Sequence, residues 1–163
     1  ILSQSDKIRT AAMQIKDFPS VLFIGRGNLY PIALEGSLKL KELSYIHAEG
    51  YAGGELKHGP ISLIDNNMPI VALMPNGSLF EKMFSNLQEL GARGGKLLTI
   101  VGSSNVGKVI DSSYWTLEIP DCEEFIAPMI YSIPMQLLAY YTADLKGNDI
   151  DQPRNLAKSV TVE

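Results

Sequence analysis

The chain has 163 residues, of which 45% are hydrophobic, and this is enough for one domain with a sizeable core. Its formal net charge is −4 and it contains no cluster of Lys or Arg, so we do not expect nucleic acid as a partner. No apolar run reaches the length of about eighteen residues that a membrane-spanning helix needs, so no membrane association is expected.

The N-terminal residues and the cysteine content bear on targeting and redox state. The first residues, Ile1 to Lys7, lack the basic-then-apolar layout of a signal peptide. They also lack an initiator Met, and we therefore expect a fragment of a longer protein. Cys122 is the single cysteine, so an internal disulfide cannot form and a reducing cytoplasm fits best. Because the flanking acids raise the pKa of its thiol, Cys122 is expected to be structural.

Helical patterns and apolar runs follow one another along the chain. In order, we expect a helix over 6–16, a strand over 21–24, a helix over 31–47, a strand over 70–74, a helix over 78–93, strands over 97–101 and 115–119, and a helix over 123–146. The strands are continuously apolar, which is typical of a parallel sheet covered on both faces. This order predicts right-handed crossovers and a three-layer, doubly wound α/β domain over residues 1–147. Residues 148–163 form a polar tail, for which a frayed terminus is the simplest interpretation.

The predicted helix over 31–47 carries charge in an unusual place. Glu35, Lys39 and Glu42 fall within about 60° of one another on a helical wheel. Most other positions are apolar or small, which indicates a buried helix, and charges are seldom buried unless paired or functional. We therefore expect this stripe to line a cleft, since the helix follows the first strand at the edge where open α/β sheets bind ligands. The alternative is an exposed ion-pair stripe, with Glu35 and Lys39 at i, i+4.

Two glycine-rich segments imitate nucleotide-binding sequences. In residues 25–30 the glycine pattern begins like a dinucleotide fingerprint, but Tyr30 replaces its third glycine. Residues 102–108 have the spacing of a phosphate-binding loop, but Val109 stands where a magnesium-binding hydroxyl is required, and no helix is expected to follow. We reject both.

The two histidines do not suggest a metal site. His47 and His58 are eleven residues apart, and no third ligand stands at a suitable spacing. His58 lies in a predicted turn, Lys57-His58-Gly59-Pro60, where its imidazole is available to solvent or to a partner. The alternative is a loop histidine that is satisfied by backbone groups.

Four segments together resemble the glucosamine-6-phosphate synthase family. They are IGRGNLYPIALEGSLKLKE (24–42), YIHAE (45–49), GELKHGP (54–60) and DQPRNLAKSVTVE (151–163). The resemblance runs from about residue 21 to the end of the chain. It implies the sugar isomerase (SIS) fold, which occurs twice in the isomerase part of that family, and this chain would be the second copy.

The resemblance also implies an activity. The family converts fructose 6-phosphate and glutamine into glucosamine 6-phosphate and glutamate. An N-terminal glutaminase domain releases ammonia from glutamine, and the isomerase part adds it to the open-chain ketose and moves a proton between C1 and C2. No cofactor is implied, and the expected partners are the first SIS subdomain, the glutaminase domain and a second copy in a homodimer.

Three catalytic residues are carried over by position. Glu42 resembles the base for the proton shift, a role that suits a carboxylate whose pKa a desolvating wall can raise. Lys158 resembles the amine that engages the sugar carbonyl as an imine. His58 resembles the acid/base that opens the sugar ring, and in this family it reaches the site of the neighbouring subunit.

The remaining carried-over positions concern substrate binding. Lys39 matches a further active-site lysine, Glu35 is expected to support the site, and Ala157 is placed among the sugar-binding residues. The tail, residues 148–163, would then be a lid that delivers Lys158 to the cleft. One segment departs from the family: residues 75–81 contain one hydroxyl and an acid where SIS folds have a Ser/Thr-rich phosphate loop. The fragment alone is therefore expected to lack a complete substrate site and to be inactive.

Two other functions compete with this one. A non-catalytic SIS module that binds a sugar phosphate would need a phosphate loop but not Glu42 and Lys158, and the sequence has the opposite balance. A flavodoxin-like carrier or signalling domain would share the fold pattern. It would need flavin-binding aromatics or an acidic phosphoacceptor cluster at the strand ends, and neither is evident.

Overall fold

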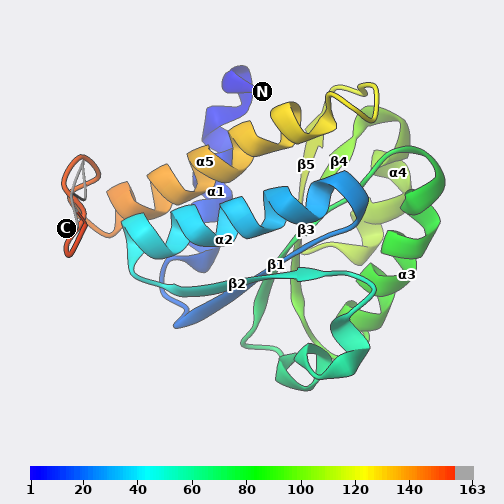
Figure 1. The fold of residues 1–163 in the computed structure, drawn as a ribbon, viewed down its shortest axis with the longest axis horizontal. Coiled ribbons are helices and arrows are strands. Elements are labelled where there is room, and N and C mark those ends of the chain that lie inside the picture. The colour runs from blue at the N-terminus through cyan, green and yellow to red at the C-terminus, as the bar shows by residue number, and fades with distance from the viewer. Residues whose placement is uncertain (157–163) are drawn as a thin grey trace, which may run out of the picture.

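The computed structural model describes residues 1–156, and their architecture is a parallel sheet between two layers of helices (Figure 1). The strands are β1 (Ser20–Gly25), β2 (His47–Ala52), β3 (Pro69–Leu73), β4 (Lys96–Gly102) and β5 (Trp115–Ile119). The helices are α1 (Ser5–Ile15), α2 (Tyr30–Ser44), α3 (Phe80–Gly91), α4 (Val106–Val109) and α5 (Ala127–Leu145). All strand pairs are parallel, in the order β2-β1-β3-β4-β5. The predicted three-layer, doubly wound domain is confirmed.

Strand β2 was not predicted from the sequence. It pairs only with β1, so it is an edge strand, and most of its residues are half-buried. Its sequence, HAEGYA, has neither an apolar run nor regular alternation. The prediction that the preceding helix continues to His47 is wrong, because the chain leaves α2 at Tyr45, whose φ of 57° is left-handed.

Two other expectations about helices need correction. A one-turn helix, α4, begins within the segment 102–108 and ends at Val109, although no helix was expected there. Helix α5 begins at Ala127 rather than at Glu123, since the residues before it form a turn in which the Ile126 N–H donates to the Glu123 carbonyl at 3.0 Å. Between α3 and β4 the chain turns at Gly94, whose φ of 88° is left-handed.

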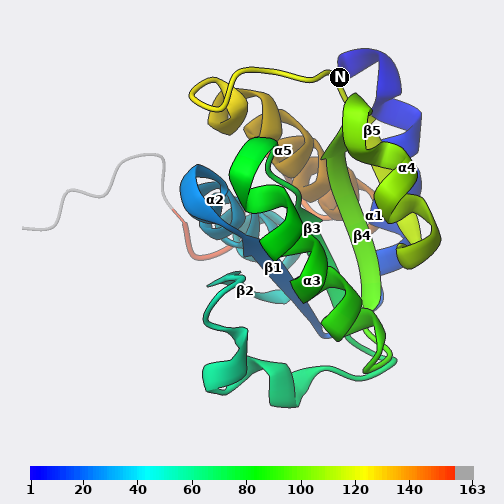
Figure 2. The same ribbon diagram turned by 90° about the vertical axis from the view of Figure 1, so that its right-hand side faces the viewer.

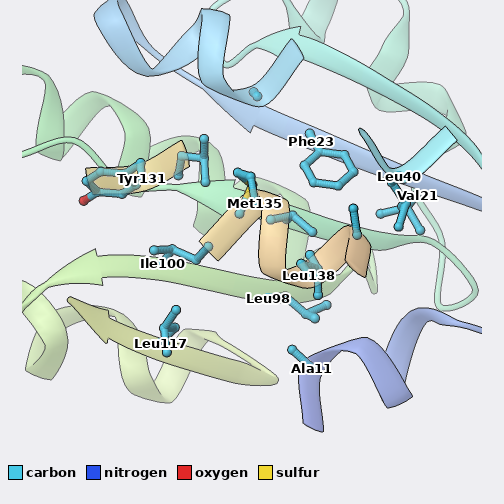
Figure 3. Packing of buried hydrophobic residues seen from close by; sticks show 14 of the residues in the cluster. Ala11, Val21, Phe23, Leu40, Leu98, Ile100, Leu117, Tyr131, Met135 and Leu138 are labelled. Atoms are coloured by element: carbon cyan, nitrogen blue, oxygen red, sulfur yellow. The ribbon is translucent and has the colours of Figure 1, made fainter. Parts of the chain in front are cut away.

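The sheet buries both of its faces against helices. On one face, α1, α2 and α5 cover inward-facing residues of the strands, and Figure 3 shows Tyr131, Met135 and Leu138 of α5 packed toward Phe23, Leu98 and Ile100. On the other face lie α3 and α4 (Figure 2), which cover a second cluster of buried residues that includes Leu22, Ile70 and Val101. Burial on both faces explains why these strands lack alternation. No helix among residues 1–156 is long and apolar enough to cross a membrane.

The position of α2 depends on a close approach at Gly36. A Cβ at this residue would lie 2.9 Å from the Met135 sulfur and 3.0 Å from the Phe23 ring, so a larger side chain would push α2 away from α5 and β1. Figure 1 shows α2 and α5 side by side over the sheet. This packing fixes the face on which α2 presents its charged residues.

Candidate active site

The charged residues of α2 form one connected group. Lys39 Nζ lies 2.8 Å from Glu42 Oε2 and 4.0 Å from Glu35 Oε1. Their side chains are 33%, 28% and 34% exposed, respectively, so water reaches all three. The predicted clustering is confirmed, and the ion pairs of the alternative interpretation are also present.

The expected burial of α2 on all sides is wrong. Leu34 and Leu38 are 41% and 44% exposed, and Pro31 and Lys41 lie on the same exposed stripe. These residues recur at intervals of three and four, which places them on the side of α2 that faces away from the sheet. The helix is therefore buried only where it meets the sheet and α5.

The ion pair determines the charge state of Lys39. The hydrogen bond to Glu42 raises the pKa of Lys39 above its ordinary value of 10.5, and the nearby charges of Glu42 and Glu35 act in the same direction against a partial loss of hydration. Lys39 is therefore a cation at neutral pH. It can donate hydrogen bonds and hold negative charge, whereas a neutral amine would be needed for attack on a carbonyl.

This raised pKa makes a testable contribution to stability. A group whose pKa is higher in the folded chain stabilises it fully below the unfolded value, and the contribution disappears as the pH rises through the folded value. Replacing Lys39 by Met should therefore lower the free energy of unfolding at neutral pH by no more than about 1 kcal/mol, because the pair is partly exposed. The loss should shrink as the pH rises above the ordinary pKa of 10.5 and through the raised pKa of Lys39.

A double-mutant cycle with urea unfolding checks this expectation. In a Glu42→Gln background, Lys39→Met should cost less stability at neutral pH than it does in the wild-type chain. A loss of stability that is equal in both backgrounds, and equal at neutral and alkaline pH, would show that Lys39 contributes through its packing alone.

The first part of the tail packs against the end of α2. The Asn148 amide donates to the Leu43 carbonyl at 2.9 Å, and the Arg154 N–H donates to the Tyr45 hydroxyl at the same distance. The Arg154 guanidinium also lies 4.0 Å from the centre of the Tyr45 ring, within range of a cation–π interaction. Figure 1 shows this end of the described chain beside the last turn of α2. The interpretation as a frayed terminus is thus wrong for residues 148–156.

A groove of about 230 Å³ lies between α2 and the tail. Its lining includes Leu38, Lys41 and Glu42 from the helix and Arg154 to Leu156 from the tail. Glu42 is the member of the charged stripe that lines the groove. Ala157 and Lys158, the tail residues expected at the site, lie outside the described residues.

His58 lies at the opposite end of the domain from Glu42. It follows β2 in a 3₁₀ turn, its side chain is 75% exposed, and its Nε2 is 3.9 Å from Glu55. Helix α2 runs back from the carboxyl end of β1 for 15 residues, or about 22 Å, and Glu42 is near its last turn. This chain alone therefore does not bring Glu42 and His58 together. The expectation that the charged stripe lies at the carboxyl edge of the sheet is therefore wrong for Glu42.

A family model described as the SIS domain matches residues 14–144, which contain all five described strands. The chain belongs to the SIS domain family. Its sequence is 56% identical over 162 residues to the glutamine–fructose-6-phosphate aminotransferase (isomerizing) of Zymomonas mobilis, covering 99% of this chain and 27% of that protein. It is 55% identical over 163 residues to the enzyme of the same name from Escherichia coli, covering 100% and 27%.

A solved structure agrees with these relatives. The C-terminal domain of glucosamine-fructose-6-phosphate aminotransferase from Francisella tularensis superposes with a TM-score of 0.88 at 50% identity, covering 93% of this chain and 42% of that one. This SIS domain therefore spans about a quarter of the length of the curated relatives that it matches.

Two residues that join the tail to α2 could not be identified from the sequence. Tyr45 and Arg154 are 109 positions apart, and neither carries a local signal of its role. Tyr45 occupies a left-handed position where Gly or Asn would have been the recognisable signal. Only the folded chain brings the two together.

The surroundings of Cys122 support its interpretation as a structural residue. Burial is the main cause that raises the pKa of its thiol, and the charges of Asp121 and Glu123 add to it. The predicted direction is confirmed, although the acids are the smaller cause. Within residues 1–156 of the SIS domain, no three His, Cys, Asp or Glu side chains are grouped so that they could hold a metal ion.

Proposed function

We propose that this SIS domain is part of an isomerizing aminotransferase, which makes glucosamine 6-phosphate from fructose 6-phosphate and ammonia. The observation that carries the proposal is the groove in which Glu42, paired with Lys39, faces the tail that leads to Lys158. The identity of 52–56% with glutamine–fructose-6-phosphate aminotransferases over almost the whole chain supports it.

Glu42 and Lys39 would act on the open-chain sugar as a pair. The Glu42 carboxylate removes a proton from C1 and returns it to C2, so that a ketose derivative becomes an aldose derivative. Lys39, a cation held 2.8 Å from that carboxylate, orients it and stabilises negative charge that develops on the sugar oxygens. Glu35 holds Lys39 from the preceding turn, at 4.0 Å.

The tail contributes the other residues of this chain that would act on the sugar. The Lys158 amine attacks the C2 carbonyl, water leaves, and an imine forms. Ammonia then adds to C2 and expels the Lys158 amine, which leaves the sugar with an imine at C2. Ala157 lies next to this lysine in sequence and would contact the sugar. The contacts of Arg154 with Tyr45 support this arrangement, because they direct the tail along the groove beside Glu42. Residues 148–163 would thus act as a lid on the domain formed by residues 1–147.

Other parts of a longer protein would complete the site. A glutaminase domain would release ammonia from glutamine, and a first SIS subdomain would hold the sugar phosphate. His58, which lies far from Glu42 within one chain, would open the sugar ring in the neighbouring subunit of a homodimer. We therefore expect negligible turnover from this chain alone. We also propose that the whole enzyme works in the cytoplasm, because the single cysteine of this chain suits a reducing compartment.

Borohydride trapping tests the role of the tail. In the longer protein, reduction in the presence of fructose 6-phosphate should fix the sugar to Lys158, and Lys158→Ala should abolish the adduct that mass spectrometry detects. Lys41→Ala is the matched control, because Lys41 lines the same groove and should leave trapping unchanged. Undiminished trapping in Lys158→Ala would assign the imine to another lysine. Sugar binding without any trapping or turnover would instead indicate a non-catalytic SIS module.

A further inference from the structure

A second hollow lies on the other side of the sheet, against α3. Its volume is about 510 Å³, within the range of about 300–1,000 Å³ that is usual for small-molecule sites. Arg26 enters it from the loop after β1, Lys57 from the segment after β2, and Lys82, Ser85 and Asn86 from α3. Figure 1 shows α3 and the segment after β2 next to each other, away from α2 and α5.

The hollow coincides with the point where the sheet reverses its order. From β1 the chain moves outward to β2 on one side, and it then continues through β3, β4 and β5 on the other. The crevice outside the carboxyl ends of such strands is where open α/β sheets bind ligands. Arg26 directly follows the last residue of β1, so its guanidinium group occupies this crevice.

Arg26 is held in place, but its hydrogen bonding is incomplete. Its Nη2 donates to Oδ1 of Asn86 at 3.3 Å, and Asn86 is only 8% exposed. Its Nε is buried and has no hydrogen-bond partner within residues 1–156, nor is Arg26 among the ion pairs found there. Buried polar groups in native proteins are almost always satisfied, so this Nε is an exception. The Nη donors that Asn86 does not use remain for an acceptor in the pocket.

The loop after β2 leaves room for this guanidinium group. A Cβ at Gly54 would lie 3.1 Å from Arg26 Nη2, and one at Gly53 would lie 3.0 Å from Asn86 Oδ1. Both glycines therefore allow the backbone to approach the pair closely. The pocket is built by three separate segments that converge on one arginine.

The charge of the lining is positive in a chain whose formal net charge is −4. Arg26, Lys57 and Lys82 outnumber the one acid of the lining, Glu81. Glu81 and Lys57 each have a partner outside the lining, Lys108 at 3.3 Å and Glu89 at 3.4 Å, so Arg26 and Lys82 carry the excess positive charge. Lys82 lies in the first turn of α3, where the helix dipole adds positive potential.

We propose that this pocket binds the phosphate group of a small phosphorylated molecule. Arg26 presents the planar, forked donors that match a phosphate, and Lys82 supplies a mobile point charge at the rim. The Ser85 hydroxyl and the Asn86 amide are additional donors. The binding group comes from side chains, so it does not need the Ser/Thr-rich loop that residues 75–81 lack.

Titration calorimetry of the 163-residue chain tests the proposal, with inorganic phosphate and fructose 6-phosphate as separate ligands at low ionic strength. Phosphate should bind, and Arg26→Gln should weaken binding about tenfold or more, because a bidentate, charge-assisted contact is lost. Lys82→Gln, a change at an exposed side chain that leaves the fold intact, should weaken binding a few-fold. Arg9→Gln on α1, across the sheet, is the matched control and should bind as the wild type does.

The two ligands distinguish free phosphate from a phosphate ester. Equal binding of both would support a site for the phosphate group alone, and tighter binding of the sugar phosphate would support a site for an ester. In either case the affinity must depend on Arg26 and Lys82. Absence of binding by both ligands, or binding that neither substitution changes, would overturn the proposal. The trapping experiment with Lys158 does not depend on this result, so each proposal can fail separately.

Discussion

A Glu42→Gln variant of the longer enzyme should lose proton exchange between C1 and C2 of the sugar, with kcat reduced about 10³-fold. The amide keeps the size of the side chain but cannot accept the proton. Because the groove that contains Glu42 keeps its shape, the affinity for fructose 6-phosphate should change much less than kcat. Incorporation of solvent deuterium into glucosamine 6-phosphate, followed by NMR, measures the proton exchange directly.

Glu35→Gln provides the matched control for this experiment. It removes the other carboxylate near Lys39, at 4.0 Å, and leaves the closer pair of Lys39 with Glu42 at 2.8 Å. We expect its proton exchange to stay within a few-fold of the wild type, since this ion pair is partly exposed. Normal deuterium incorporation in Glu42→Gln would remove Glu42 from the role of base.

Gly25→Ala should destabilise the chain by about 3 kcal/mol, the largest effect that we expect from adding a single methyl group. A Cβ at Gly25 would lie 2.3 Å from the Leu29 carbonyl oxygen and 2.6 Å from its carbon. Both atoms belong to the backbone that enters α2, so no side chain can turn aside to make room. Urea unfolding followed by circular dichroism gives the change in the free energy of unfolding.

The same substitution at Gly107 controls for the loss of glycine flexibility. Nothing lies within 4 Å of a Cβ at this position, and the residue is inside α4. Gly107→Ala should therefore leave stability unchanged or raise it by up to about 1 kcal/mol. A small effect in Gly25→Ala would mean that the loop before α2 can shift, and that the positions of Arg26 and α2 tolerate such a shift.

The fold was largely predictable because its central strands carry a strong local signal. Val21 to Ile24 and Ile70 to Leu73 are buried on both sides, so nearly every residue in them is apolar. Strand β2 gave no such signal because its Glu49 and Gly50 are only half-buried at the edge of the sheet. Its place is set by pairing with β1, which is a long-range interaction.

The site was predictable only where it depends on neighbours within one helix. The Lys39–Glu42 pair follows from a spacing of three residues, which periodicity reveals. The contact of Tyr45 with Arg154 and the pocket around Arg26 depend on how distant segments pack, and no periodicity encodes them. The separation of Glu42 from His58 likewise follows from the direction in which α2 runs over the sheet.

That separation has a consequence for mixtures of inactive enzymes. In the proposed homodimer, each reaction centre would combine Glu42 of one copy with His58 of the other. A hybrid of a Glu42→Gln copy and a His58→Ala copy would then contain one centre with both defects and one with none. Randomly reassociated copies should recover about a quarter of wild-type activity, although neither parent has any.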